Sequence, residues 1–131
     1  MTTNSVLSLQ KINHFYYNFQ SLNDINFSIE KGDIVSLLGP SGSGKTTILR
    51  VISGLEKIAS GQVLISNQTV SGNGVFLLPH KRKVGLVFQD YALFPHLNVE
   101  KNITYGFQLR NFDKLNEVIE LLEIEDIQKS F

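Results

Sequence analysis

The chain has 131 residues, which is enough for one small domain. Twelve lysine and arginine residues balance twelve aspartate and glutamate residues, and this balance excludes a generally basic nucleic-acid-binding protein or an acidic disordered tail. The absence of cysteine excludes disulfides and thiolate metal sites, and no apolar run approaches the roughly 18 residues that cross a bilayer.

The first third of the chain predicts β-strands. Residues 6–12 have a loosely alternating apolar pattern, and an aromatic cluster at residues 14–19 is expected to turn. Residues 25–30 alternate between apolar and polar side chains, which is typical of a half-buried strand. After a turn at residues 31–33, the nearly continuous apolar run at residues 34–38 predicts a strand that is buried on both faces.

Helices and strands alternate in the rest of the chain. Apolar residues share one helical face between residues 48 and 55, and Gly54 is placed to end that helix. We expect a strand at residues 63–65, a polar turn region at residues 67–74 and a second buried strand at residues 84–88. Two helices follow, one capped by Asn98 and running through Val99, Ile103 and Phe107, the other with Leu115, Val118, Ile119 and Leu122 on one face. This order predicts an α/β chain with some parallel sheet.

A phosphate-binding loop lies between the strand at residues 34–38 and the first helix. The loop matches the pattern G-x-x-x-x-G-K-[ST] at every fixed position. Its glycines permit positive φ and let backbone N–H groups approach a phosphate, and the helix N-terminus adds a positive dipole. Lys45 is expected to reach the β- and γ-phosphates, and the Thr46 hydroxyl to ligate Mg²⁺. The residues of this nucleotide-phosphate site are Gly39, Pro40, Ser41, Gly42, Ser43, Gly44, Lys45 and Thr46.

Other families with a phosphate loop fit the chain less well. A GTPase adds a D-x-x-G segment and an N-K-x-D segment, and the sequence contains neither. A small-molecule kinase needs several arginines near the transferred phosphate, whereas this chain has only Arg50, Arg82 and Arg110.

The wider sequence context resembles the nucleotide-binding subunit of an ATP-binding-cassette (ABC) transporter. The resemblance extends from Leu7 to Phe131 and rests on four stretches. These are Tyr16 with residues 21–29, the loop Gly39–Thr47 with residues 49–56, residues 60–63, and residues 84–99 around Gln89. It implies a phosphate-loop NTPase (RecA-like) core with an antiparallel β subdomain in residues 1–97, and the start of a helical subdomain in residues 98–131.

The resemblance also implies roles for single residues. Tyr16 is similar to the aromatic residue that stacks on adenine in that family, and Tyr17 is the alternative. The family more often has glycine where Tyr17 stands. Gln89 follows a predicted strand at the sheet edge where ligands gather, and its amide oxygen could ligate Mg²⁺ or orient the attacking water. Thr47 directly follows the phosphate-loop motif and is part of the nucleotide-binding segment that the resemblance implies. The implied cofactors are ATP and Mg²⁺, with Lys45 and Gln89 as the catalytic residues.

The partners that the resemblance implies are a membrane permease subunit and a second nucleotide-binding subunit. The permease would bind the apolar loop Tyr91–His96, which would place the protein at the cytoplasmic face of the membrane. Residues 78–82 and 93–96 look most like the corresponding segments of importer subunits for ferric iron and related small ions. Sulfate, molybdate and polyamine importers share much of this sequence. The basic run at residues 80–83 is expected to be a solvated turn.

Two motifs of the family do not occur in the chain. These are the serine-glycine signature and the apolar strand that ends in Asp-Glu. Residues 121–126 have acidic residues at helical spacing and do not match that strand. The sequence therefore resembles the N-terminal half of a transporter ATPase, and we expect a truncated product or fragment with uncovered sheet edges and no hydrolysis of its own. The alternative is a non-catalytic nucleotide-binding or interaction module.

Overall fold

The computed structural model describes residues 5–90, 92–106 and 112–123, and the side chains of the last segment from residue 116 onward. The chain divides into two compact units, Met1–Leu86 and Val87–Phe131. The expected division between residues 97 and 98 lies within the second unit. As a statement about the subdomains of the family, it stays a prediction.

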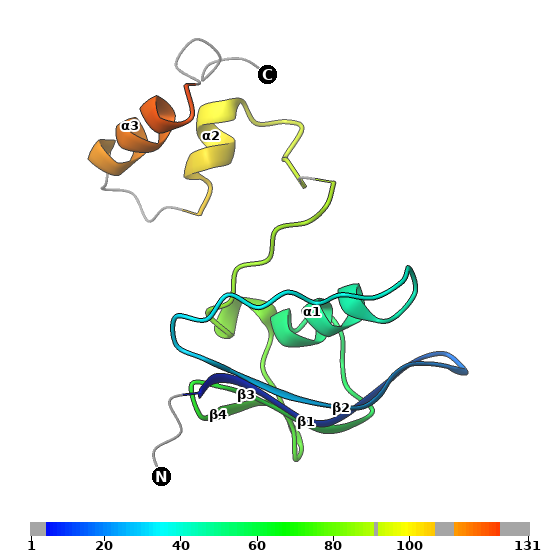
Figure 1. The fold of residues 1–131 in the computed structure, drawn as a ribbon. Coiled ribbons are helices and arrows are strands. Elements are labelled where there is room, and N and C mark those ends of the chain that lie inside the picture. The colour runs from blue at the N-terminus through cyan, green and yellow to red at the C-terminus, as the bar shows by residue number, and fades with distance from the viewer. Residues whose placement is uncertain (1–4, 91, 107–111, 124–131) are drawn as a thin grey trace. The chain divides into compact units, whose positions relative to one another are not determined.

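The first unit is built on a five-stranded antiparallel sheet (Figure 1). Its spatial order is β2-β1-β3-β4-β5. The strands are β1 (Ser5–Tyr16), β2 (Phe19–Glu30), β3 (Ser60–Ile65), β4 (Gln68–Gly72) and β5 (Val75–Phe76). The antiparallel β subdomain expected from the sequence is therefore present.

The hairpin of β1 and β2 confirms the period-2 pattern in the second strand. Ile25, Phe27 and Ile29 are partly buried, and the polar residues between them are exposed. The aromatic cluster turns at Tyr17, because Tyr16 pairs with Phe19 across the hairpin. Tyr17 has a φ of 52°, in the left-handed region that favours glycine. A glycine would adopt this conformation with less strain than tyrosine does.

The polar region at residues 67–74 is not only a turn, as the sequence analysis predicted, but contains β4, and β5 follows it directly. Ser66 and Asn67 have φ values of 47° and 62°, which suits a two-residue hairpin turn between twisted strands. β4 then pairs with β3, with Ile65 opposite Gln68. Only Val70 of β4 is a large apolar residue, so the strand lacks the alternation that would have predicted it.

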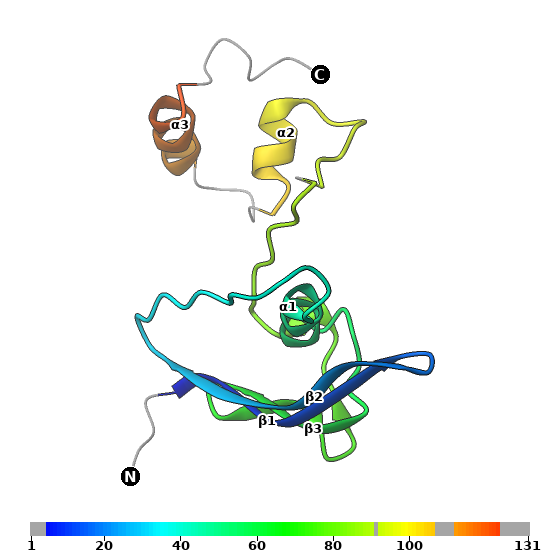
Figure 2. The ribbon, with the colours of Figure 1, turned by 45° about the vertical axis from the view of Figure 1, so that its right-hand side comes forward.

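Helix α1 (Lys45–Ser53) packs on one face of the sheet, as Figures 1 and 2 show. It confirms the predicted helix, and Gly54 ends it with a φ of 85°. The buried core combines Ile48 and Val51 of the helix with strand residues Leu9, Ile12, Leu22, Val63 and Val70. The phosphate loop is thus attached to a helix that is anchored by its apolar face.

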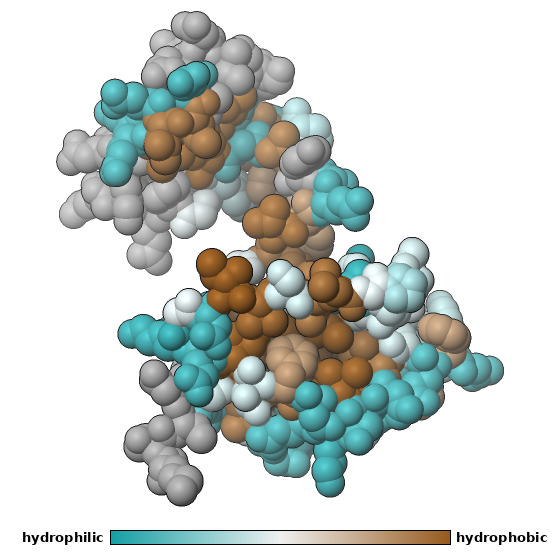
Figure 3. Space-filling model, in the orientation of Figure 1, coloured by the Kyte–Doolittle hydropathy of each residue, from teal (hydrophilic) through white to brown (hydrophobic). Residues whose placement is uncertain are grey.

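The structure corrects the prediction of two buried strands in a parallel sheet. Residues 34–38 and 84–88 form no strand within the described part of the chain. Ile34 and Leu38 are 98% and 91% exposed, and Val87 is 92% exposed. A buried strand needs neighbours that bond its N–H and C=O groups, and no described strand pairs with either segment. The apolar side chains that gather over α1 and the preceding segment are visible in Figure 3.

Arg82 also departs from the prediction, because it is buried rather than part of a solvated turn. It follows the short helix η1 (Pro79–Lys81) and is 2% exposed. Its guanidinium donates five hydrogen bonds, to the carbonyl oxygens of Val51, Ile52, Val70 and Leu77 and to the Ser71 hydroxyl. Two of these acceptors are at the C-terminal end of α1, where the helix dipole favours a cation. Burial lowers the pKa of Arg82.

The second unit contains the helices α2 (Val99–Thr104) and α3 (Phe112–Leu121). The predicted cap is confirmed, since the Asn98 side chain accepts a hydrogen bond from the Lys101 amide. The apolar face expected for the last helix is only partly buried, because Ile119 is buried and Leu122 is 57% exposed. Phe107 and the side chain of Leu115 lie outside the described residues.

Candidate nucleotide-binding site

The phosphate loop wraps around the side chain of Lys45. The Lys45 Nζ donates hydrogen bonds to the carbonyl oxygens of Gly39 and Pro40, at 2.9 and 2.7 Å, and to the Ser43 hydroxyl, at 3.2 Å. All three acceptors belong to the loop itself. The ammonium group is therefore held over the loop that the sequence analysis assigned to phosphate binding, and no carboxylate among the described residues competes for it.

Gly44 joins the loop to α1 and cannot be replaced without strain. Its φ is 89°, and a Cβ there would lie 2.7 Å from the carbonyl oxygen of Ser21 and 2.8 Å from the side chain of Leu22. The loop therefore approaches the backbone of β2 more closely than any side chain would permit. This contact fixes the start of α1 against the hairpin.

The N-terminus of α1 has the polarity of an anion site. No side chain caps it, and its first turn contains no acidic residue. The first amides of a helix have no partners within the helix, and the helix dipole adds partial positive charge there. A phosphate group would satisfy both features. Thr46 is exposed and Thr47 is buried, so of these two threonines only Thr46 presents its side chain to a ligand.

Tyr16 lies at the end of β1 in a polar cluster. It is half-buried, and its hydroxyl donates a hydrogen bond of 3.1 Å to Glu56 Oε1. Its ring packs edge-on against the ring of His14, with 4.6 Å between the centroids. Tyr17, the alternative platform, is fully exposed in the turn. The structure thus anchors Tyr16 and leaves Tyr17 without packing.

Gln89 and the apolar loop belong to the second unit. Gln89 is exposed, and Tyr91 lies outside the described residues. Leu93 is 70% exposed, while the Phe94 ring lies 4.2 Å from that of Tyr105, centroid to centroid. The phosphate loop belongs to the first unit, so the structure brings Lys45, Thr46 and Tyr16 into one unit and Gln89 into the other.

Asn102 is a residue that the sequence analysis did not single out. Its side-chain oxygen accepts a hydrogen bond from the Phe94 amide, at 2.8 Å. Its side-chain nitrogen donates to the carbonyl oxygens of Phe94, Leu97 and Asn98. Asn102 therefore holds the loop at residues 93–98 against α2. Three residues separate it from the capping residue Asn98, and no local pattern in the sequence marks this role.

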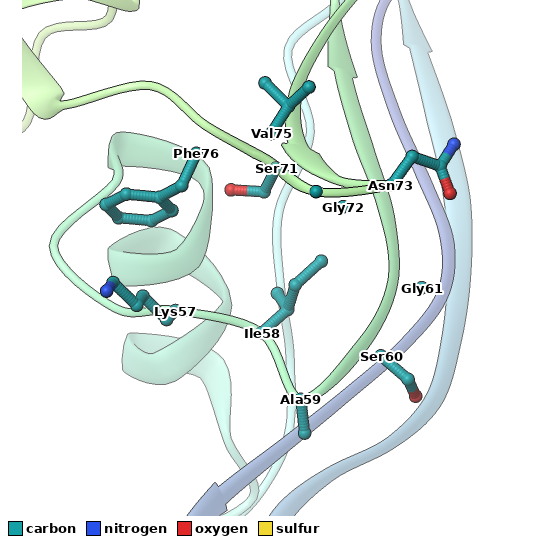
Figure 4. Close-up of a pocket in the computed structure, with 11 residues that line it drawn as sticks. Lys57, Ile58, Ala59, Ser60, Gly61, Ser71, Gly72, Asn73, Val75 and Phe76 are labelled. Atoms are coloured by element: carbon teal, nitrogen blue, oxygen red, sulfur yellow. The ribbon is translucent and has the colours of Figure 1, made fainter.

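The first unit also has a cavity of about 390 Å³ between the segment after α1 and the β4–β5 turn (Figure 4). None of its lining residues belongs to the phosphate loop. The Lys57 ammonium lies 5.2 Å from the centroid of the Phe76 ring, and small residues such as Gly61, Gly72 and Ser71 form much of the wall. Lys57 is the only charged group of the lining, so the cavity lacks a pair of groups suited to acid–base chemistry.

Within the described ranges, no three His, Cys, Asp or Glu side chains cluster to hold a metal ion. No helix in the described part of the chain is long and apolar enough to cross a membrane.

Comparison with known proteins identifies the family. The family described as ABC transporter matches residues 22–131, most of the chain. The chain belongs to the ABC transporter family. The match includes the phosphate loop, Gln89 and the apolar loop of this ABC transporter chain, and it begins just after the turn that contains Tyr17.

Curated relatives of this ABC transporter chain are import ATP-binding proteins. The chain is 40% identical to the spermidine/putrescine import ATP-binding protein of Thermotoga maritima, over 92% of this chain and 33% of that protein. It is 39% identical to a probable sulfate/thiosulfate import ATP-binding protein of Chlorella vulgaris, over 94% of this chain and 53% of that protein. A sulfate/thiosulfate import ATP-binding protein of Neisseria meningitidis is also 39% identical, over 95% of this chain and 37% of that protein. The ABC transporter chain thus spans between a third and about half the length of these relatives.

A solved structure shares the fold of this ABC transporter chain. It is CbiO1 from Clostridium perfringens, described as part of the ABC transporter complex CbiONQ. The TM-score is 0.74 at 24% identity, and the match covers 97% of this chain and 54% of that one. The likeness confirms the fold of an ABC ATPase N-terminal region.

Proposed function

We propose that this chain is the ATP-binding part of an ABC-type importer subunit. The observation that carries the proposal is the phosphate loop, whose carbonyl oxygens hold the Lys45 ammonium and which leads into the uncapped N-terminus of α1. A phosphate can replace these loop carbonyls as the acceptor for Lys45, because an anionic oxygen binds an ammonium group more strongly than a neutral carbonyl oxygen does. The names of the 39–40% identical relatives support the importer class.

In this proposal, different residues bind the base and the phosphates of Mg-ATP. Lys45 and the loop amides hold the β- and γ-phosphates, and the exposed Thr46 hydroxyl is suited to be a ligand of Mg²⁺. Tyr16 stacks on adenine, because it is an anchored aromatic side chain in the same unit as the loop. Gln89, in the second unit, stays proposed as a ligand of Mg²⁺ or as the residue that orients the attacking water. Mg²⁺, when bound, would neutralise charge between the β- and γ-phosphates.

We propose a small ionic solute as the imported substrate. Both polyamines and sulfate, in the names of the relatives, belong to this class. The same names lend no support to ferric iron, which the wording of residues 78–82 and 93–96 had suggested. The proposed partners are a permease subunit at the loop Tyr91–His96 and a second nucleotide-binding subunit, with the protein at the cytoplasmic face of the membrane.

The alternative is a nucleotide-binding module without hydrolysis. Both functions require the phosphate loop, so they differ in turnover rather than in binding.

Calorimetry with Mg-ATP tests the proposal on the full 131-residue chain. Lys45→Ala should abolish binding, because it removes the cation that faces the phosphates. Lys31→Ala, at an exposed lysine in the turn after β2, is the matched control and should bind as the wild type does. Equal affinity of the wild type and Lys45→Ala for ATP would refute the phosphate site.

A further inference from the structure

A partly buried polar cluster connects Tyr16 to the segment that follows α1. His14 is 2% exposed, and its Nδ1 lies 2.6 Å from the Ser21 hydroxyl. Its Nε2 lies 3.6 Å from Glu56 Oε2, while Oε1 of the same carboxylate accepts the Tyr16 hydroxyl. Arg50 Nη1 lies 3.6 Å from Glu56 Oε1. The Glu56 carboxylate thus faces a phenol, an imidazole and a guanidinium at once.

This cluster restricts the torsions of the Tyr16 side chain. The edge-on contact with His14 limits rotation of the ring, and the hydrogen bond to Glu56 fixes the position of the hydroxyl. His14 cannot move aside easily, because it is buried and bonded to Ser21 of the neighbouring strand. A tyrosine has only two side-chain torsions, so two anchors leave the ring little freedom. An ordered ring binds a base without losing that entropy on binding.

The same cluster relates the base to the phosphates through one helix. Lys45 is the first residue of α1, and Arg50 lies within it, one turn before its end. Glu56 follows the helix, and its backbone N–H donates to the Arg50 carbonyl. Since α1 rises by about 1.5 Å per residue, its two ends lie about 12 Å apart. Tyr16 is bonded to Glu56, beyond the C-terminal end of α1. The same cluster also reaches the N-terminal end of the helix, because Ser21, which bonds His14, lies against Gly44.

We propose that Glu56, supported by His14, is a positioning residue that fixes the Tyr16 ring as the base-facing wall of the nucleotide site. This inference rests on the proposed ATP-binding function and adds a determinant of base recognition to it. Glu56 acts only through Tyr16 and does not touch the phosphates. Its loss should weaken ligands that carry a base and spare ligands that consist of phosphates alone.

The test compares Mg-ATP with Mg-tripolyphosphate by calorimetry on the full chain. Glu56→Ala should weaken ATP about fivefold, as expected for one lost hydrogen bond, and change tripolyphosphate less than about twofold. Glu56→Gln keeps an acceptor for the Tyr16 hydroxyl and should restore ATP affinity to within about twofold. Glu30→Ala is the matched control, because Glu30 is exposed on β2 and its side chain pairs with no described group.

A double-mutant comparison shows whether Glu56 acts through the phenol. Tyr16→Phe should weaken ATP as much as Glu56→Ala, and the double variant should lose no more than either single one. Additive losses, or equal losses for ATP and tripolyphosphate, would overturn the inference in favour of mere packing between hairpin and helix. If circular dichroism shows Glu56→Ala to be unfolded, Tyr16→Phe decides alone, and unchanged ATP affinity there overturns the inference. A wild-type chain that binds neither ligand would instead refute the proposed function itself.

Discussion

The Arg82 guanidinium lies directly against Gly54, where a Cβ would come within 2.7 Å of its Cζ atom. Gly54 ends α1 in the left-handed conformation, and Arg82 bonds the last carbonyl oxygens of the same helix. The glycine thus serves two purposes at once, the positive φ of the helix end and the space for a buried cation.

This contact predicts that Gly54→Ala is far more harmful than alanine at a comparable glycine. Gly54→Ala should lower the free energy of unfolding by about 3 kcal/mol, because it adds backbone strain and displaces Arg82 from its hydrogen bonds. Gly32 has a φ of 95° but nothing within 4 Å of an added Cβ, so Gly32→Ala should lose only about 1 kcal/mol. Urea denaturation measures both, and equal losses would show that the approach of Arg82 is unimportant.

Tyr17 and Tyr16 should respond in opposite ways to substitution. Tyr17 is fully exposed with a φ of 52°, so Tyr17→Gly should raise the free energy of unfolding by about 0.5–1 kcal/mol and leave ATP affinity unchanged. Tyr16→Ala should weaken ATP more than pyrophosphate, because stacking acts on the base alone. Denaturation and calorimetry test the pair. Loss of ATP affinity in Tyr17→Gly would make Tyr17 the platform.

Asn102 should control the order of the loop at residues 93–98. Asn102→Ala removes the acceptor of the Phe94 amide, so hydrogen exchange at that amide should become about tenfold faster, as expected for one lost hydrogen bond. Asn116 is exposed on α3, and Asn116→Ala should leave the exchange at Phe94 unchanged. Unaltered exchange in Asn102→Ala would mean that the aromatic contact with Tyr105 is sufficient to hold the loop.

The 131-residue chain should hydrolyse ATP no faster than its Lys45→Ala variant. It contains the residues proposed to bind phosphate, but the sequence has neither the apolar strand ending in Asp-Glu nor the serine-glycine signature. Binding without additional stabilisation of the transition state does not accelerate the chemical step. Release of inorganic phosphate measures this rate. If the wild type hydrolyses ATP steadily and Lys45→Ala abolishes this activity, a carboxylate among residues 121–126, which the sequence analysis rejected, would be catalytic. Glu123 and Asp126 are the first candidates.

Short-range patterns predicted the elements in which each residue depends on near neighbours. The period of α1, its end at Gly54, the alternation of β2 and the cap at Asn98 were all read from a few adjacent residues and are confirmed. The phosphate loop belongs to the same class, because its residue types are dictated by local backbone conformation and by the helix that follows.

The tertiary structure decided what depends on residues far apart in the chain. β4 exists because β3 supplies the partners for its backbone, although its own sequence has little strand character. Arg82 is buried because acceptors from α1, β4 and residue 77 converge on it, which no pattern within residues 80–83 could indicate. Residues 34–38 show the converse case: their apolar sequence predicts a buried strand, but a strand forms only where another strand satisfies its hydrogen bonds.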